Sequence, residues 1–424
     1  MVTGQRIVIL LLALSLLAGA ITGRELYYRL SYLWGLLLVL SWLMSFLALR
    51  GVQMKRTSRT LRSQVGQIFE ERYEILNTGR LPRLWLEVRD ESSLPGASGS
   101  HVMTLIGGRE SRSYLARTWL RERGVFPLGP TVLASGDLFG LFPTDRTVPY
   151  QESLLVYPLI VDVRSFPNPP GLLPGGEHLR RRTPQITSNA SGVREYGPGD
   201  PLNRIHWLST ARRNRLMVKE FELDPLAEVW IFTDASKSVQ AEKPEDAPEF
   251  DPKDVLRKRT KFELPPSTLE YGVSIAASLA RYYLQRGRAV GLVYASHTVH
   301  ILPSDRGARQ LAKILESLAL LKAEGNLPLQ SLVEAQARHL PRGSTAVLIT
   351  PSASETVFHT ADVLLRRGLR PVVVLLDATT FGGYFSSERL ASSLDFLGVP
   401  VCQIAYGDDL SAALSATVSR PTWA

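Results

Sequence analysis

Three oxygen-bearing side chains follow an apolar stretch near the middle of the chain. Residues 230–233 read WIFT, and Asp234, Ser236 and Ser238 follow at every second position. One carboxylate and two hydroxyls in a single turn supply the hard oxygen ligands that Mg²⁺ prefers. Small polar residues of this kind also cap helices and stabilise turns through local hydrogen bonds. The pattern leaves both readings open, a divalent-cation site or a structural turn.

A second candidate lies in the basic stretch from residue 176 to 219, which holds nine Lys or Arg side chains and three acidic ones. Guanidinium groups around a glycine-rich turn suit a carboxylate or phosphate ligand. The reading that we favour is structural: Arg194, Asp200 and Arg204 pair with one another and attach this segment to the following domain, and the neighbouring aromatic rings pack. The candidate residues, structural or anion-binding, are Arg194, Tyr196, Gly199, Asp200, Arg204, His206, Trp207, Arg212 and Lys219.

Several function classes lack their signatures in this sequence. It has no GxxxxGK[ST] phosphate loop, no HExxH and no GxSxG. The single cysteine, Cys402, lies in the strand-like run VPVCQIAYG and reads as a buried apolar residue. The basic runs at 180–182 and 211–215 come with no module that reads nucleic acid. We therefore expect neither an enzyme nor a nucleic-acid-binding protein, and no cofactor unless Mg²⁺ binds.

The elements that position Asp234 alternate between apolar strands and amphipathic helices. From residue 226 to 424, runs such as AEVWIFT, AVGLVYA, TAVLIT and RPVVVLLDA alternate with helical stretches. This predicts a doubly wound, mostly parallel Rossmann-type sheet, which binds ligands beyond the carboxyl ends of its strands. Residues 240–267 interrupt the pattern with seven acidic, six basic and five proline residues. That composition cannot build a core, so it predicts a mobile or partly ordered insertion over the top of the domain.

Two further segments precede this domain. Residues 51–160 consist of short alternating runs separated by glycine and proline, which is typical of a small all-β sandwich. Residues 161–225 contain several prolines and the arginine-rich block, and they predict an extended connector.

Residues 1–50 read as a two-helix transmembrane hairpin. No charged residue occurs from Ile7 to Gly23 or from Leu30 to Leu49, and about 20 apolar residues span a bilayer. Cations that follow a span mark its cytoplasmic side, which predicts an inner (plasma) membrane protein with cytoplasmic soluble domains. The alternative is a signal peptide with a cleavage pattern at residues 18–20. The cations after the second stretch are Arg50, Lys55, Arg56, Arg59 and Arg62.

These residues resemble a bacterial membrane-protein family of unknown function, the DUF58 family. The likeness rests above all on REYGPGDPLNRIHWLSTARRNRLMVKEFE and on the strand ending in Asp234. It extends to the N-terminal hairpin, RERGVFPLGP, SGDLFGLF and LLVYP. The resemblance implies a von Willebrand factor A-like fold for the C-terminal half. It also implies partners among MoxR-type AAA+ ATPases and transglutaminase-like membrane proteins, with no established catalytic activity.

The resemblance also implies where a cation site would be completed. Von Willebrand A domains add a threonine from a second loop and an aspartate from a third loop to a turn like that of Asp234. The second loop should fall near residues 323–330, which have no threonine, and the third is 351–354, which has no aspartate. We therefore expect a degenerate site that keeps the turn and has weak or absent affinity for Mg²⁺.

The leading hypothesis is a membrane-anchored, non-catalytic interaction or adaptor protein. It would present a von Willebrand A-like domain to a cytoplasmic partner such as a MoxR-type AAA+ ATPase. One alternative is a magnesium-dependent enzyme that acts on phosphorylated substrates. Another is a binder of acidic lipid or cell-envelope precursors that uses the arginines of residues 176–219.

Overall fold

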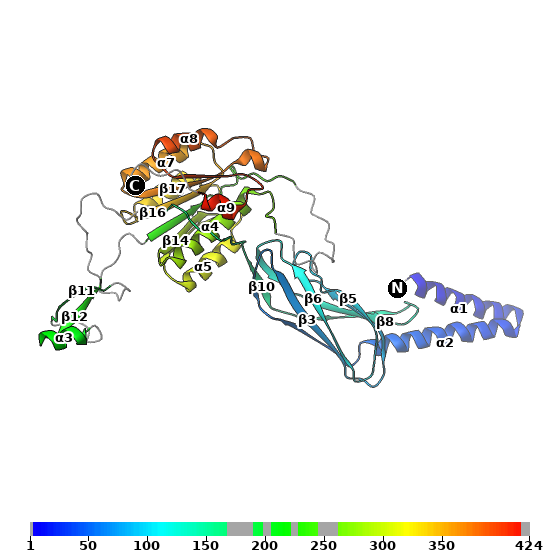
Figure 1. Cartoon of the computed structure of the whole chain (residues 1–424). Coiled ribbons are helices and arrows are strands. Elements are labelled where there is room, and N and C mark those ends of the chain that lie inside the picture. Colours follow the sequence, from blue (N-terminus) through cyan, green and yellow to red (C-terminus); the bar gives the residue numbers. More distant parts are fainter. Residues whose placement is uncertain (1–2, 168–189, 198–204, 222–227, 245–261, 417–424) are drawn as a thin grey trace. The chain divides into compact units, whose positions relative to one another are not determined.

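The computed structural model describes residues 3–167, 190–197, 205–221, 228–244 and 262–416 (Figure 1). Its contacts divide the chain into two compact units. The β unit comprises Met1–Tyr157 and Pro248–Phe262, and the α/β unit comprises Pro158–Ala247 and Glu263–Ala424. Most of the insertion predicted at 240–267 lies outside the described residues.

The β unit begins with two helices, α1 (Thr3–Thr22) and α2 (Glu25–Ala48), which pack side by side and are joined by a turn at Gly23. The hydroxyls of Ser15 and Ser31 lie 2.9 Å apart between the helices. Apolar side chains cover most of the outer surface of both helices. With mean hydropathies of 2.0 and 1.9 over 19 and 24 residues, the two helices are long and apolar enough to cross a bilayer.

The sheets of the β unit enclose a common core. Strands β1–β3–β6 form one sheet, β5–β4–β8–β9 a second and β2–β10–β7 a third. Alternate residues of β3 are buried, so Tyr73 and Ile75 meet Leu86 and Val88 of β4 and Leu133 of β8. The strands are β1 (Val52–Ser58), β2 (Arg62–Gln64), β3 (Ile68–Asn77), β4 (Arg83–Asp90), β5 (His101–Ile106), β6 (Ser111–Trp119), β7 (Gly124–Pro127), β8 (Thr131–Gly136), β9 (Pro143–Val148) and β10 (Ser153–Tyr157).

Arg56 lies inside this core, with a side chain that is 1% exposed. It donates to both oxygens of Glu71, at 2.8 and 2.9 Å, and to Asp90 at 2.9 Å. The Tyr73 hydroxyl also donates to Asp90, at 3.1 Å. Burial raises the pKa of Glu71, although the Arg56 guanidinium opposes this shift. Arg56 was counted among the cations that follow the second span, but two buried carboxylates bind it inside the unit.

The end of α2 is built into the same unit. Leu49 and Val52, which follow the helix, are buried in the core between the sheets. Arg83 of β4 donates to the carbonyl oxygens of Leu47 and Arg50, each at 2.6 Å. Leu47 lies in the last turn of α2 and Arg50 lies two residues after the helix, so both bonds hold the end of the helix against β4. The second helix therefore continues into the sheets without a linker.

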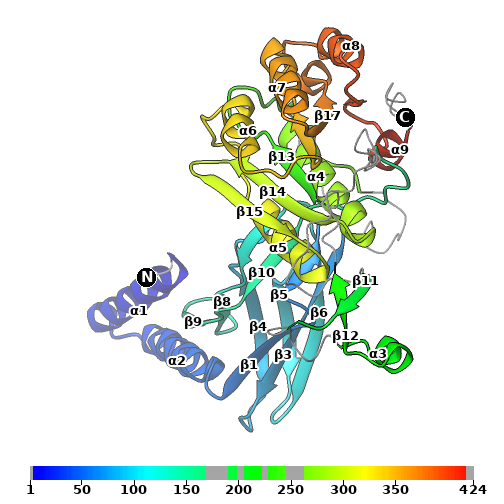
Figure 2. The same ribbon diagram turned by 90° about the vertical axis from the view of Figure 1, so that its left-hand side faces the viewer.

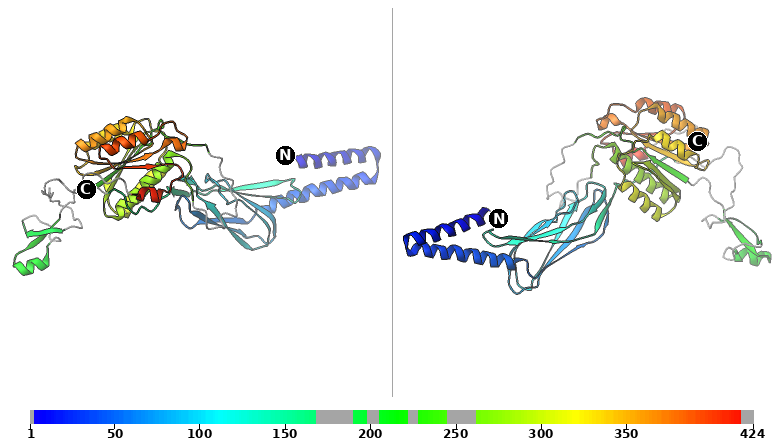
Figure 3. Two further views of the ribbon diagram at one scale, coloured as in Figure 1. Left: turned by 45° about the horizontal axis from the view of Figure 1, so that its top comes forward. Right: turned by 180° about the vertical axis from the view of Figure 1, so that it is seen from behind.

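The α/β unit is built on a six-stranded sheet with the order β15–β14–β13–β16–β17–β18 (Figure 1, Figure 3). Every neighbouring pair is parallel except β14–β15. Helices α4, α5 and α9 lie on one face, and α6, α7 and α8 lie on the other. This confirms the predicted α/β fold with a mostly parallel sheet.

The central strands β16 and β17 are buried along almost their whole length, as their Val- and Leu-rich sequences predict. The strands are β13 (Glu228–Thr233), β14 (Ala289–Ala295), β15 (Val299–Asp305), β16 (Thr345–Thr350), β17 (Arg370–Leu376) and β18 (Val401–Ile404). The helices are α4 (Thr268–Gln285), α5 (Ala308–Ala319), α6 (Leu329–Ala337), α7 (Glu355–Arg366), the 3-10 turn η2 (Ala378–Phe381), α8 (Glu388–Phe396) and α9 (Leu410–Ser415).

A small hairpin carries the described part of the basic block. It consists of β11 (Ala190–Glu195), α3 (Trp207–Arg213) and β12 (Met217–Phe221), with β11 antiparallel to β12. Ile205 and Met217 are buried within it.

Candidate functional site

Asp234 lies at the carboxyl end of β13, where the order of the strands in the sheet reverses. The next strand in sequence, β14, lies on one side of β13, and the later strand β16 lies on its other side. Such a switch point is where doubly wound sheets bind ligands. Asp234 and Ser236 are buried, whereas Ser238 is exposed. The structure thus brings the three predicted residues together at the edge that the sequence indicated.

Both oxygens of Asp234 accept hydrogen bonds from the protein itself. The Thr350 hydroxyl donates to Oδ2 at 2.7 Å, and the backbone N–H of Ser236 donates to Oδ1 at 3.1 Å. Thr350 is the last residue of β16, so this contact joins the ends of two neighbouring strands. The sequence analysis missed Thr350, although a polar residue that ends the apolar run TAVLIT was a usable signal.

The loop before α6 lies beside the Asp234 turn, where the resemblance placed a second loop. Lys237 N–H donates to the Gly325 carbonyl at 2.8 Å, and Gly325 N–H donates to the Ala235 carbonyl at 3.1 Å. The residue that meets the turn is therefore a glycine, which contributes backbone contacts and no side-chain ligand.

We expect Gly325→Ala to destabilise the α/β unit by about 1 to 3 kcal/mol. A Cβ atom there would lie 2.4 Å from the Ala295 carbonyl oxygen and 3.0 Å from that of Ala235. Both atoms are backbone, so the loop must move away from the turn. Thermal unfolding of the full-length protein in detergent measures the effect.

Gly272→Ala in α4 is the matched control, because its Cβ would meet its nearest neighbour at 3.6 Å, an ordinary contact. It should be neutral or slightly stabilising, since alanine favours a helix over glycine by about 1 kcal/mol. Equal losses from both substitutions would contradict a steric role for Gly325.

The loop after β16 brings no further carboxylate to Asp234. Ser352 N–H donates to the Thr350 hydroxyl at 3.0 Å, and Ser354 caps α7 by accepting from Thr356 N–H at 3.3 Å. Glu355 follows in the first turn of α7, where its side chain is exposed. Within the part of the chain that the structure describes, no three His, Cys, Asp or Glu residues are grouped as a metal site.

These residues do not fit a tight site for Mg²⁺. The donor set holds one carboxylate, and the Ser236 and Ser238 hydroxyls lie 3.1 Å apart, within hydrogen-bonding distance of each other. Burial raises the pKa of Asp234, against the hydrogen bonds from Thr350 and Ser236. Surroundings that disfavour the ionised form of a carboxyl group also make it a poorer ligand for a cation. The arrangement fits a locked turn better.

Only part of the predicted basic site can be described. Gly199, Asp200 and Arg204 lie outside the described residues, so their expected pairing with Arg194 does too. The positions of the others are as follows: Arg194 is on β11, Tyr196 follows it, Lys219 is on β12 and Arg212 is exposed in the last turn of α3.

The two aromatic residues of the block do not pack as predicted within the described part. The His206 ring caps α3, accepting from Ser209 N–H at 3.2 Å. Trp207 is 68% exposed, because α3 buries none of its residues. Arg215 pairs with Glu195 at 2.7 Å across the hairpin.

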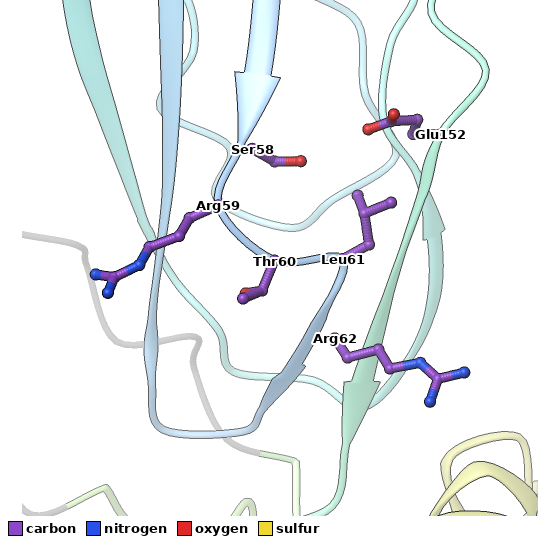
Figure 4. A pocket seen from close by; sticks show the side chains of 6 residues that line it. All are labelled: Ser58, Arg59, Thr60, Leu61, Arg62 and Glu152. Carbon is purple, nitrogen blue, oxygen red and sulfur yellow. The ribbon is translucent and has the colours of Figure 1, made fainter.

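A surface depression in the β unit is lined by Arg59, Arg62 and Glu152 among others (Figure 4). The two guanidinium groups point to opposite sides of it, so they do not converge on an anion.

Cys402 is buried, and burial raises the pKa of its thiol to about 11, which excludes an activated nucleophile at that position.

Comparison with known proteins gives one family match and one curated relative. The model of the family described as "Protein of unknown function DUF58" matches residues 192–246, from β11 to beyond the Asp234 turn. The "Uncharacterized protein YeaD" of Bacillus subtilis (strain 168) is 23% identical over 230 residues, which cover 54% of this chain and 51% of that protein. The chain thus matches about half the length of this relative.

Solved structures show little likeness. The complex of zinc 2-glycoprotein and prolactin inducible protein from human seminal plasma matches 24% of this chain and 92% of the other, at 8% identity and a TM-score of 0.19. A GH20 exo beta-N-acetylglucosaminidase from Vibrio harveyi matches 82% and 60%, at 7% identity and a TM-score of 0.17. Scores this low carry no information on fold or activity. The chain is therefore similar to the DUF58 family from its basic hairpin through the Asp234 turn.

Proposed function

We propose that this protein is a membrane-anchored, non-catalytic interaction protein whose α/β unit binds another protein through the carboxyl edge of its sheet. The observation that carries the proposal is the loop after β17. Tyr384 and Phe385 are 93% and 75% exposed there. Exposed adjacent aromatic residues on a monomer surface mark interaction sites, and aromatic side chains dominate binding energy.

The loop that presents these aromatic residues is well held. Asp377 caps η2 by accepting from Thr379 N–H, and Gly383 N–H donates to the Ala378 carbonyl at 2.7 Å. Leu320 and Leu327, on loops at the same edge, are also exposed. A preformed apolar edge loses less conformational entropy on binding than a flexible one.

A von Willebrand A-like assignment for the α/β unit belongs to the same proposal. An Asp-x-Ser-x-Ser turn follows the first strand of the unit. The loop at 323–330 hydrogen-bonds to this turn through its backbone. The loop at 351–354 follows Thr350, which donates to Asp234. In this proposal the Asp234 turn stabilises the edge and binding needs no cation. The resemblance to DUF58 proteins nominates a MoxR-type AAA+ ATPase as the partner, with a transglutaminase-like membrane protein as a second.

The proposed orientation places the α/β unit in the cytoplasm. A helix hairpin returns the chain to the side on which it started, and Arg6 and Arg50 flank the two spans on that side. Cations next to spans favour the cytoplasmic face. A cytoplasmic ATPase can therefore reach the carboxyl edge.

Binding of the full-length protein in nanodiscs to a purified MoxR-type AAA+ ATPase from the same organism tests the proposal. We expect Tyr384→Ser with Phe385→Ser to weaken binding at least about tenfold, or about 1.4 kcal/mol. Phe396→Ser is the matched control, because Phe396 is 96% exposed at the far end of α8, away from the carboxyl edge.

The control variant and Asp234→Asn should both bind as the wild type does. Absence of binding by the wild type would overturn the nominated partner. Equal losses from the edge variant and Phe396→Ser would overturn the nominated surface.

A further inference from the structure

The turn between β8 and β9 is a rigid projection of the β unit. Asp137 is buried at its base and accepts three backbone hydrogen bonds, from Phe139 at 2.9 Å, Leu141 at 3.2 Å and Phe142 at 2.7 Å. Gly140 completes the turn with a φ of 67°, which favours glycine. Residues 137–142 therefore hold one conformation.

This turn exposes two large apolar side chains. Leu138 and Phe139 are each 62% exposed, whereas Leu141 beside them is buried. A fixed backbone prevents both side chains from folding back into the core. An exposed apolar pair on a rigid tip is a candidate contact site for an apolar partner.

The tip lies at the end of the helix hairpin. Figure 1 and Figure 2 show the β8–β9 turn next to the start of α1. A Cβ atom on Gly4 would lie 3.4 Å from the Leu141 Cδ2 methyl group, and α2 packs against both β8 and β9. Gly4 is two residues before Arg6, after which the uncharged stretch of α1 begins. The tip is thus level with the point at which the helices would enter the bilayer.

We propose that Leu138 and Phe139 insert into the lipid interface on the side of the membrane where Arg6 and Arg50 lie. The inference rests on the membrane anchoring in the proposed function. The occupant is lipid because the tip continues the apolar surface of α1 and α2. Aromatic and aliphatic side chains beside cations suit this region of a membrane. The β unit would then contact the bilayer at three points, the two helices and this tip.

Site-specific fluorescence in lipid tests the proposal. The single native cysteine is buried, so Cys402→Ala provides a background without reactive thiols. Phe139→Cys, Leu138→Cys, Leu10→Cys and Leu115→Cys are each introduced into the full-length chain and labelled with an NBD dye. The proteins are reconstituted in nanodiscs with and without lipids spin-labelled near the headgroup. Leu10 is exposed on α1, and Leu115 is exposed on β6 as the matched control.

We expect spin-labelled lipid to quench the dye at 138 or 139 at least about twofold more than at 115, with a blue-shifted emission. Quenching at 10 without quenching at 138 and 139 would overturn the tip proposal and leave the anchoring intact. Absence of quenching at 10 would overturn the anchoring and the tip proposal together. A dye at 139 that is shielded from aqueous iodide but not quenched by lipid would show a protein occupant and also overturn the proposal.

Discussion

Replacement of Arg56 by methionine is expected to destabilise the β unit by about 3 to 5 kcal/mol, because it leaves two buried carboxylates without their cation. Arg56 makes two hydrogen bonds to Glu71 and two to Asp90, and all three side chains are almost fully buried. A loss of this size lowers the melting temperature of a domain of this length by roughly 10 °C. Thermal unfolding of the full-length protein in detergent measures it.

Arg117→Met is the matched control for this prediction. Arg117 pairs with Glu70 at 2.8 Å on the neighbouring strands, but the two side chains are 46% and 41% exposed. Exposed ion pairs contribute about 0 to 1 kcal/mol, so the control should unfold close to the wild type. Acidification should recover part of the stability of Arg56→Met, since protonated carboxyl groups need no cation. Similar melting temperatures for both variants would show that burial of the network is not what stabilises the unit.

Replacement of Asp234 by alanine is expected to destabilise the α/β unit by about 2 to 4 kcal/mol. The Thr350 hydroxyl and the Ser236 N–H would both lose their acceptor inside the protein, and each unpaired buried group costs about 1 to 3 kcal/mol. Asp234→Asn keeps one acceptor oxygen and the same size, so it should lose much less. Comparison of the two melting temperatures, each with and without Mg²⁺, separates a structural carboxyl from a cation ligand. If Mg²⁺ raised the melting temperature of the wild type but not that of Asp234→Asn, Asp234 would be a cation ligand after all.

The stabilities of the wild type and Asp234→Asn should depend differently on pH because of the pKa of Asp234. Burial raises this pKa in the folded protein, against two hydrogen bonds, whereas the unfolded value is about 4. The folded state therefore holds the proton more tightly. Protonated Asp234 therefore contributes fully to the stability below about pH 4, and this contribution is lost as the pH rises through the pKa of Asp234 in the folded protein. Asp234→Asn does not titrate, so its stability relative to the wild type should rise from pH 4 towards pH 7. A constant difference would contradict the raised pKa.

The sequence predicted elements well where neighbouring residues determine them. Unbroken apolar runs such as TAVLIT and RPVVVLL gave buried parallel strands, because a sheet covered on both faces needs no polar alternation. The turn after β13 was placed correctly for the same reason, since Asp234 ends such a run.

Contacts between distant residues were not predictable in this way. Arg56 meets Glu71, Asp90 and Thr131, which lie 15, 34 and 75 residues away. In sequence it belongs to the cluster of cations that follows the second apolar stretch. A period of two from Val52 would have placed it on the buried face of β1.

Thr350 reaches Asp234 across 116 residues. The pairing of β13 with β16 decides this contact, and the register of that pair is a property of the whole sheet. The exposure of Tyr384 and Phe385 likewise depends on how η2 is capped, and composition alone does not reveal it.

The junction held by Arg83 has a mechanical consequence. The Arg83 guanidinium on β4 binds one carbonyl group in the last turn of α2 and one just after it, so the end of the helix is held against the sheet. In the proposed membrane anchor, a force on the β unit would therefore tilt α2 and would not be absorbed by a flexible linker.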